Sequence, residues 1–109
     1  MFEASEVAHL FVSSLRTVVE ATADRDAELA SQLRRAATSA ALNTAEAGRR
    51  QGRDRRYRCR IAAAECAEAV VAARVAAAWG YVSDLEVAPA LALADRLHAI
   101  LYRLAHPRP

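Results

Sequence analysis

The sequence predicts an all-α protein whose single domain, residues 1–109, is an up-down-up-down four-helix bundle. Alanine supplies 28 of the 109 residues and β-branched residues are sparse, a composition that favours helix over strand. Only three glycines and three prolines interrupt the chain. Together with a few capping residues, they separate four segments of about 20 residues, and segments of that length with short connections form antiparallel bundles.

The first two helices are expected at about residues 4–23 and 27–47. Asp24 or Asp26 is expected to cap the second, because a short acidic side chain accepts the free backbone N–H groups of a first helical turn. Gly48 is expected to end it. The expected inner positions are Val7, Phe11, Ser14 or Leu15, and Val18 on the first helix, and Leu29, Leu33, Ala36, Ala40, Asn43 and Ala47 on the second.

The third and fourth helices are expected at about residues 53–79 and 84–105. Ser83 followed by Glu86 forms a capping box that opens the fourth, and Pro89 in its early turns predicts a kink or a new start. The heptad spacing of the apolar residues predicts shallow crossing angles. The expected inner positions are Tyr57, Ile61, Ala64, Glu68, Val71, Val75 and Ala78 on the third helix, and Leu93, Leu97, Ile100 and Leu104 on the fourth.

Positive charge is concentrated in residues 49–60, which contain seven arginines and one aspartate although the whole chain has a net charge of only +2. All fifteen cations are arginine, a residue suited to bidentate contacts with carboxylate or phosphate. One interpretation is that this segment binds nucleic acid without sequence preference, because clustered arginines displace counterions from phosphates. The residues concerned are Arg49, Arg53, Arg56 and Arg60 on one helical face, with Arg50, Arg55 and Arg58 beside them.

A second interpretation is slightly favoured. The same arginines can be the solvated start of a helix, paired with Glu46, Asp54 and neighbouring acidic residues or buried at a contact between subunits. Tyr57 is the only aromatic residue in the segment, so base stacking there would be limited.

Polar residues at inner positions predict a structural polar core made by Asn43, Glu46, Glu68, Arg34 and Arg35. If the second and third helices are antiparallel about residues 50–51, Arg34 or Arg35 lies level with Glu65 and Glu68. We expect an ion pair there that fixes register, because a charge in a core needs a partner. Asn43 lies level with Arg58 and far from Glu68, so the two do not form a catalytic pair.

The sequence shows no catalytic or metal-binding motif. The three histidines, His9, His98 and His106, lack the spacing that places two ligands on one helical face, and there is no Glu-x-x-His pair, phosphate-binding glycine loop or nucleophile elbow. We therefore expect no enzymatic activity, no cofactor and no metal. A small metal-binding or enzymatic bundle is the least favoured alternative.

Three further features predict a cytoplasmic location. Cys59 and Cys66 are seven residues apart, about 10.5 Å along one helix, which is too far for a disulfide and typical of a reduced protein. The N-terminal residues do not form a signal peptide, and no apolar stretch is long enough to span a membrane.

Two stretches, QLRRAATSAALNTAEAGRR and RIAAAECAEAVVAARVAAAWGYVS, resemble the four-helix-bundle proteins encoded in intervening sequences of bacterial 23S ribosomal RNA genes. The resemblance covers about residues 29–83, with Ala64 and Glu65 in place of a Gly-Ser pair. The matching positions are Gln32, Leu33, Arg34, Arg35, Ala36 and Ala37, then Ser39, Asn43, Ala45 and Glu46, then Ile61, Ala62 and Glu68, and finally Trp79, Gly80 and Tyr81.

The resemblance implies a bundle that assembles as a ring, commonly a homopentamer, with no known enzymatic activity. A related group, the accessory variability proteins of diversity-generating retroelements, is similar in fold and binds nucleic acid and a reverse transcriptase. An accessory factor of such a reverse transcriptase is therefore an alternative function. Independently of any resemblance, residues 53–79 are apolar around most of the helix, which also favours oligomerisation.

Overall fold

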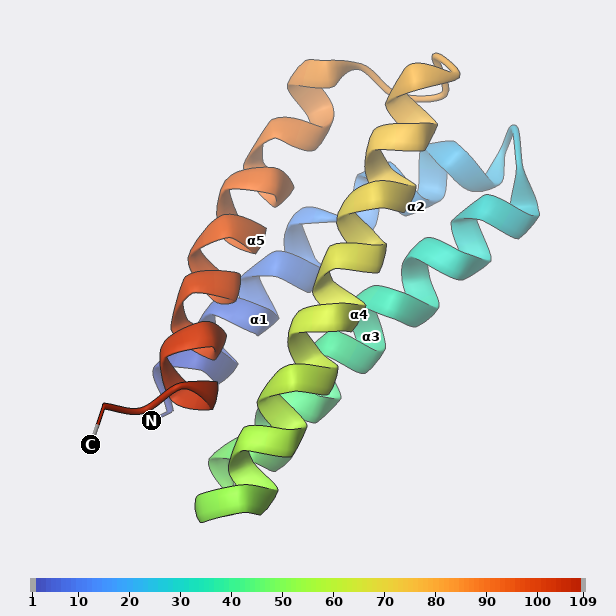
Figure 1. Cartoon of the computed structure of the whole chain (residues 1–109). Helices are drawn as coiled ribbons and strands as arrows, with labels where there is room; N and C mark the ends of the chain where they lie inside the picture. The colour runs from blue at the N-terminus through green and yellow to red at the C-terminus, as the bar shows by residue number, and fades with distance from the viewer. Residues whose placement is uncertain (1, 109) are drawn as a thin grey trace.

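The computed structural model describes residues 2–108, and every regular element in that range is a helix (Figure 1). The elements are α1 (Glu3–Ser14), α2 (Arg16–Ala23), α3 (Ala27–Gly48), α4 (Gly52–Ala78) and α5 (Asp84–Ala105). Because α1 and α2 together form one arm, the predicted bundle of four antiparallel helices is confirmed (Figure 1). The bundle measures 46 × 22 × 21 Å.

The predicted first helix is interrupted at Leu15, where α1 ends and α2 begins. The Ser14 hydroxyl donates to the carbonyl of Phe11 at 2.6 Å, and a side-chain bond of this kind competes with the helical ladder and bends it. As a result, α1 packs against both α3 and α5, whereas α2 packs mainly against α3.

Local capping sets the helix ends much as the sequence predicts. Asp26, not Asp24, caps α3 by accepting the backbone N–H of Leu29 at 3.0 Å. Both halves of the Ser83–Glu86 capping box are present at the start of α5. At the end of α4, Gly80 adopts a φ of 80°, which is the left-handed geometry that glycine tolerates best.

The new start predicted near Pro89 is wrong, because α5 is continuous from Asp84 to Ala105. Proline leaves one carbonyl of the preceding turn without its helical partner, here that of Leu85. Both residues are exposed, so water can hydrate that carbonyl, and the capping box has already begun the helix.

The core consists of one stripe from each helix. It combines large side chains of α1, α3 and α5, such as Phe11, Leu33 and Leu97, with mostly small ones from α4. The inner positions predicted for α3 and α5 are confirmed as buried or half-buried. The buried stripe of α4 consists of Cys59, Ala62, Cys66, Ala69, Ala72, Ala73 and Ala76.

The inner face predicted for the third helix is therefore wrong. Of the seven predicted positions, Ile61 and Val75 are half-buried and the other five are exposed, including Val71 at 60%. Both faces of α4 carry apolar residues at heptad spacing, so periodicity did not distinguish them. The fold buries the face with smaller side chains, which lets α4 lie close to its neighbours. No helix within residues 2–108 is both long and apolar enough to cross a membrane.

Candidate functional site

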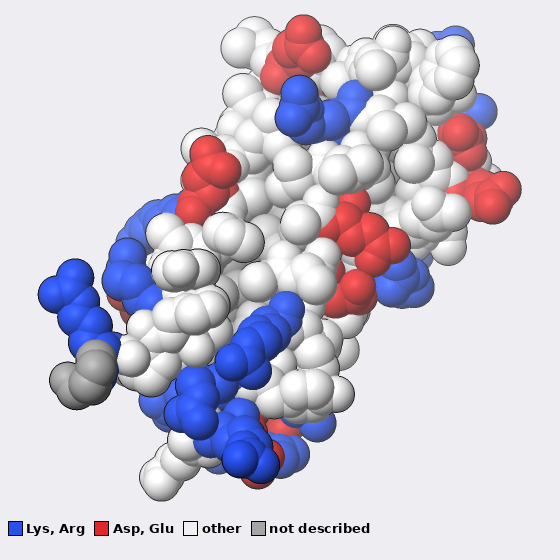
Figure 2. Space-filling view, in the orientation of Figure 1, with Lys and Arg blue, Asp and Glu red and all other residues white. Residues whose placement is uncertain are grey.

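The arginines of residues 49–60 lie at the end of the bundle where α3 turns into α4, here called the basic end (Figure 2). Gly52 begins α4 with a φ of 58°, so Arg53 and the later arginines lie in the first turns of that helix. Arg49 is instead the C-terminal cap of α3. The predicted four-residue stripe is thus reduced to Arg53, Arg56 and Arg60, because the helix starts too late to include Arg49.

Two of the arginines hold the turn together. Arg50 contacts Glu46 at 3.0 Å, near the end of α3, and Asp54 at 4.0 Å, in the first turn of α4. The Nε atom of Arg55 donates to the carbonyl of Ala47 at 3.0 Å and to that of Arg50 at 2.9 Å. Carbonyls at a helix C-terminus lack the amide donor of the next turn, so Arg55 adds a side-chain donor to Ala47, which also accepts the Arg50 amide, and to Arg50 just past the end of α3.

Arg58 bridges the same two helices further from the turn. Its Nη1 atom donates to Oδ1 of Asn43 at 3.1 Å, and the Asn43 amide in turn donates to the carbonyl of Ser39 at 3.0 Å. The predicted register, with Asn43 level with Arg58, is confirmed. Asn43 is half-buried and serves as a link between α3 and α4.

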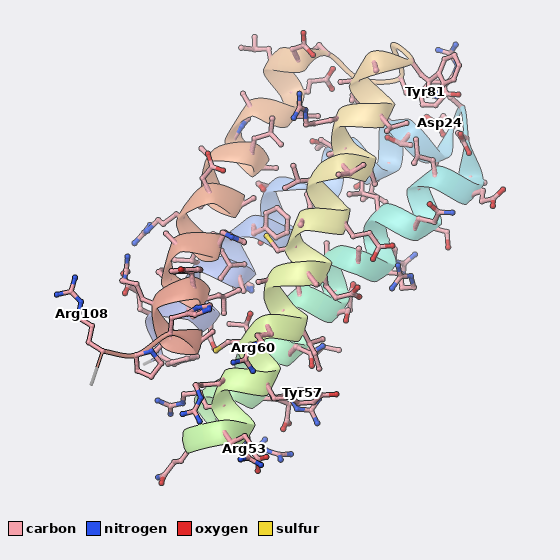
Figure 3. The ribbon with its side chains drawn as sticks, in the orientation of Figure 1. Asp24, Arg53, Tyr57, Arg60, Tyr81 and Arg108 are labelled. Carbon is pink, nitrogen blue, oxygen red and sulfur yellow. The ribbon has the colours of Figure 1, made fainter. Side chains whose placement is uncertain are left out.

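The remaining arginines of the segment face solvent. Within the described residues 2–108, Arg49, Arg53, Arg56 and Arg60 have no ion pair or side-chain hydrogen bond, and all but the half-buried Arg56 are exposed. Figure 3 shows Arg53 and Arg60 at the basic end of α4. Positive charge in a first helical turn is unfavourable toward the helix dipole, and Asp54 is the one acidic residue of that turn. These arginines therefore have capacity for an external anion.

The fold adds groups to the basic end that sequence reasoning missed. Because α5 runs antiparallel to α4, its last turn, which carries Arg103, lies near the first turns of α4 (Figure 1), whereas Arg108 extends away from Arg53 and Arg60 (Figure 3). Tyr102 is 57% exposed, and its ring stacks on that of His106 with centroids 4.1 Å apart. The up-down order of the helices, which the sequence predicts, was sufficient to place the residues at the end of α5 near the start of α4.

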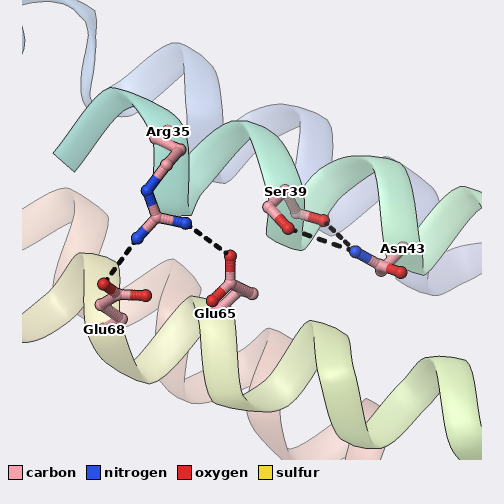
Figure 4. Close-up of polar contacts among 5 residues, drawn as sticks. All are labelled: Arg35, Ser39, Asn43, Glu65 and Glu68. Carbon is pink, nitrogen blue, oxygen red and sulfur yellow. Dashed lines mark hydrogen bonds and ion pairs between the residues drawn. The ribbon is translucent and has the colours of Figure 1, made fainter. Parts of the chain in front are cut away.

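The predicted ion pair between the second and third helices is present, with Arg35 and not Arg34 as the cation (Figure 4). Arg35 contacts Glu68 at 2.6 Å and Glu65 at 3.2 Å. The hydrogen bond with Glu68 raises the pKa of Arg35, and the same bond lowers the pKa of Glu68 below its ordinary value.

The expectation that these groups form a buried core is wrong. The side chains of Arg35 and Glu68 are 55% and 47% exposed, Arg34 is exposed, and Glu46 and Asn43 are half-buried. The reason is the rotation of α4, which places its heptad stripe containing Glu68 on the outside of the bundle. In the single chain, Glu68 is therefore an exposed residue that links α4 to α3 through its ion pair with Arg35.

The two cysteines are buried, free thiols. Burial raises the pKa of Cys66 to about 11, with a further contribution from the charge of Asp95, and burial also raises the pKa of Cys59. Neither thiol therefore has the thiolate character that nucleophilic chemistry needs. In the described part of the chain, no three His, Cys, Asp or Glu side chains are grouped closely enough to hold a metal ion.

Known proteins share this four-helix architecture. The family model described as 23S rRNA-intervening sequence protein matches residues 2–103. The chain belongs to this family. The resemblance of residues 29–83 is thus confirmed, and it extends to both outer helices of the intervening-sequence bundle.

One solved structure shares the fold of this intervening-sequence protein. It is described as a protein with unknown function from the S23 ribosomal protein family of Bacteroides thetaiotaomicron VPI-5482. The TM-score is 0.83 and the identity 17%, over 94% of this chain and 98% of the other. At that identity the likeness shows the fold alone. No curated protein matches the chain.

Proposed function

We propose that this protein is a non-enzymatic scaffold that assembles as a homo-oligomer, a closed ring of five copies. The observation that carries the proposal is the second apolar stripe of α4, here called the outer seam: Tyr57, Ile61, Ala64, Glu68, Val71, Val75 and Ala78. It recurs at alternating steps of four and three, the spacing at which two helices interlock side chains along a shared axis.

The outer seam is only partly covered by the rest of the chain: Glu68 pairs with Arg35 of α3, and Ile61 and Val75 are half-buried. Val71 and Tyr57 are 60% and 57% exposed, whereas the other stripe of α4 is buried. Over 27 residues the helix is about 40 Å long, so the seam extends along the bundle as two apolar runs on either side of Glu68. Surfaces of this kind mark protein contacts, and a second copy supplies a matching helix.

Light scattering coupled to gel filtration tests the assembly. Five copies of the 11.8 kDa chain give a mass of about 59 kDa. Ala64→Glu introduces a charge into the outer seam and should shift the mass toward that of the monomer. Ala92→Glu is the matched control, since Ala92 is also an exposed helical alanine but lies on α5. A monomeric parent protein would contradict oligomerisation, and equal effects of the two changes would contradict the seam.

A second proposed activity is sequence-independent nucleic-acid binding at the basic end. It is supported by the arginines that lack a partner within residues 2–108, Arg53, Arg56 and Arg60, and by Arg103 in the last turn of the antiparallel α5. In a ring, each copy contributes one such cluster, and linked clusters add avidity without new contacts. A cytoplasmic location is part of this proposal and is supported by the free, buried cysteines.

Filter binding of labelled RNA and DNA at several salt concentrations tests the activity. Replacing Arg53, Arg56 and Arg60 together by alanine should flatten the dependence of binding on salt by up to about three units per engaged copy. The control replaces Arg16, Arg34 and Arg74, which are exposed but lie away from the basic end. Absence of binding at low salt would contradict the proposal. A reverse-transcriptase gene beside the coding sequence would favour the retroelement accessory role.

A further inference from the structure

A cavity of about 560 Å³ lies between α4 and α5 and is lined by both helices. The two rows of residues that line it continue along the helices to the basic end, and these rows together are here called the furrow, with the cavity as its upper part. On α5 the lining residues Asp84, Ala88, Leu91 and Asp95 alternate steps of four and three, and the same steps continue to His98 and Tyr102. On α4 the cavity is lined by Ala77, Arg74 and Val70. The same alternating steps of three and four continue along α4 to the basic end, through Ala67, Ala63, Arg60 and Arg56.

The register of the two helices places the aromatic and cationic groups together. The thiol of Cys66 on α4 lies 4.0 Å from the carbonyl of Ala94 on α5. Tyr102 is eight residues further along α5, about 12 Å, and the antiparallel α4 reaches Arg58 over the same distance. Arg56 and Arg60 lie two residues to either side of that level, so Tyr102 is level with these two arginines, on the row of α5 that faces their row of α4.

Tyr102 is held in a defined orientation. Its ring is stacked on the His106 ring with an interplanar angle of 23°, and the Nδ1 atom of His106 lies 3.0 Å from the Tyr102 carbonyl. More than half of Tyr102 remains exposed, at 57%. A preordered aromatic surface loses little conformational freedom when a ligand stacks on it.

We propose that this lower part of the furrow binds single-stranded nucleic acid, with unpaired bases stacking on the Tyr102–His106 pair and phosphates contacting Arg56 and Arg60. Grooves that combine cationic side chains with exposed aromatic rings bind single strands, because every base has a π face and a duplex hides its bases. The inference rests on the proposed nucleic-acid binding and adds that the ligand is single-stranded.

The upper part of the furrow limits the site to the basic end. Asp84 and Asp95 line that part, and neither has an ion pair among residues 2–108. Their carboxylates repel phosphates, so a strand that lies over Tyr102 is expected to leave the furrow before reaching Asp95. Tyr57, the aromatic residue that the sequence singled out, lies on the outer seam of α4 and not in this furrow.

Fluorescence anisotropy with one labelled oligonucleotide, as a single strand and as a duplex, tests the inference in both RNA and DNA. We expect tighter binding of the single strand. Tyr102→Leu should weaken single-strand binding roughly five- to 100-fold, because stacking on an aromatic side chain accounts for that range per base. Duplex binding and the salt dependence should change little. Tyr102→Phe, which retains the ring, should restore most of the single-strand affinity.

The outcomes distinguish base stacking on Tyr102 from the proposed electrostatic binding of nucleic acid at the basic end. No binding of any nucleic acid would overturn both. Binding without preference for the single strand, or an equal loss on both forms in Tyr102→Leu, would overturn the stacking site and leave electrostatic binding intact. Because Tyr102 is largely exposed, circular dichroism should show the same fold for the parent and both variants.

Discussion

Replacing Gly48 by alanine tests how the start of the chain is fixed to the basic end. A Cβ atom at Gly48 would lie 2.7 Å from Cδ2 and 3.1 Å from Cγ of the Phe2 ring, so the ring must move. Overpacking of this kind costs about 1–3 kcal/mol. Alanine in place of glycine inside a helix gains up to about 1 kcal/mol. The net expectation is that Gly48→Ala lowers the free energy of unfolding by about 0–3 kcal/mol.

The sign of the effect depends on Phe2. In a Phe2→Ala background the clash is absent, so Gly48→Ala should raise the free energy of unfolding by up to about 1 kcal/mol. Urea unfolding followed by circular dichroism measures all four proteins, at one chain concentration because an oligomer's stability depends on it. An equal change in both backgrounds would refute the coupling of Phe2 to Gly48. It would also weaken the view that Phe2, whose ring lies 5.6 Å from the guanidinium carbon of Arg55, helps to order the turn.

Three further predictions concern the core and its titrating groups. Leu33→Ala should destabilise the protein by roughly 2–5 kcal/mol in the same unfolding assay, because Leu33 is fully buried. Glu68→Gln should reduce stability at neutral pH. Because Arg35 lowers the pKa of Glu68 in the folded state, the difference from the parent should close as the pH falls below 4.5. The pKa of Cys66 is raised from 9.0 to about 11, so unfolding releases a proton between those values and stability should fall as the pH rises through them. Cys66→Ala should lose that part of the pH dependence, and an unchanged alkaline profile would contradict the assignment.

Most of the fold could be predicted because its signals are local. Alanine content, the Ser83–Glu86 capping box and Gly80 determine where helices form and end, and they act within a few residues of themselves. The break at Leu15 escaped prediction because it accompanies the bond from the Ser14 hydroxyl to the Phe11 carbonyl, and a serine inside a helix can equally point its hydroxyl to solvent. The rotation of α4 escaped prediction because both of its faces satisfy the same apolar spacing.

The candidate site was predicted in part. The arginine segment and the Arg35–Glu68 pair follow from composition and from the antiparallel register. The exposure of that pair and the division of the arginines were not predictable, because each depends on which acceptors the folded chain offers. Arg55 donates to backbone carbonyls that lack a next-turn amide because α3 ends there, whereas Arg53 donates to no acceptor in residues 2–108.

The sequence by itself determined the helices, their antiparallel order, the register of α3 and α4 and the concentration of arginine at one turn. Each of these depends on residue type and on distance along the chain. Only the tertiary structure decided which stripe of α4 is buried, which arginines are free, and that Tyr102 and His106 lie at the basic end with them. The physical reason is that burial and pairing depend on the space between helices. Which neighbours a side chain contacts is fixed only when all four helices have packed and the rotation of each about its axis is set.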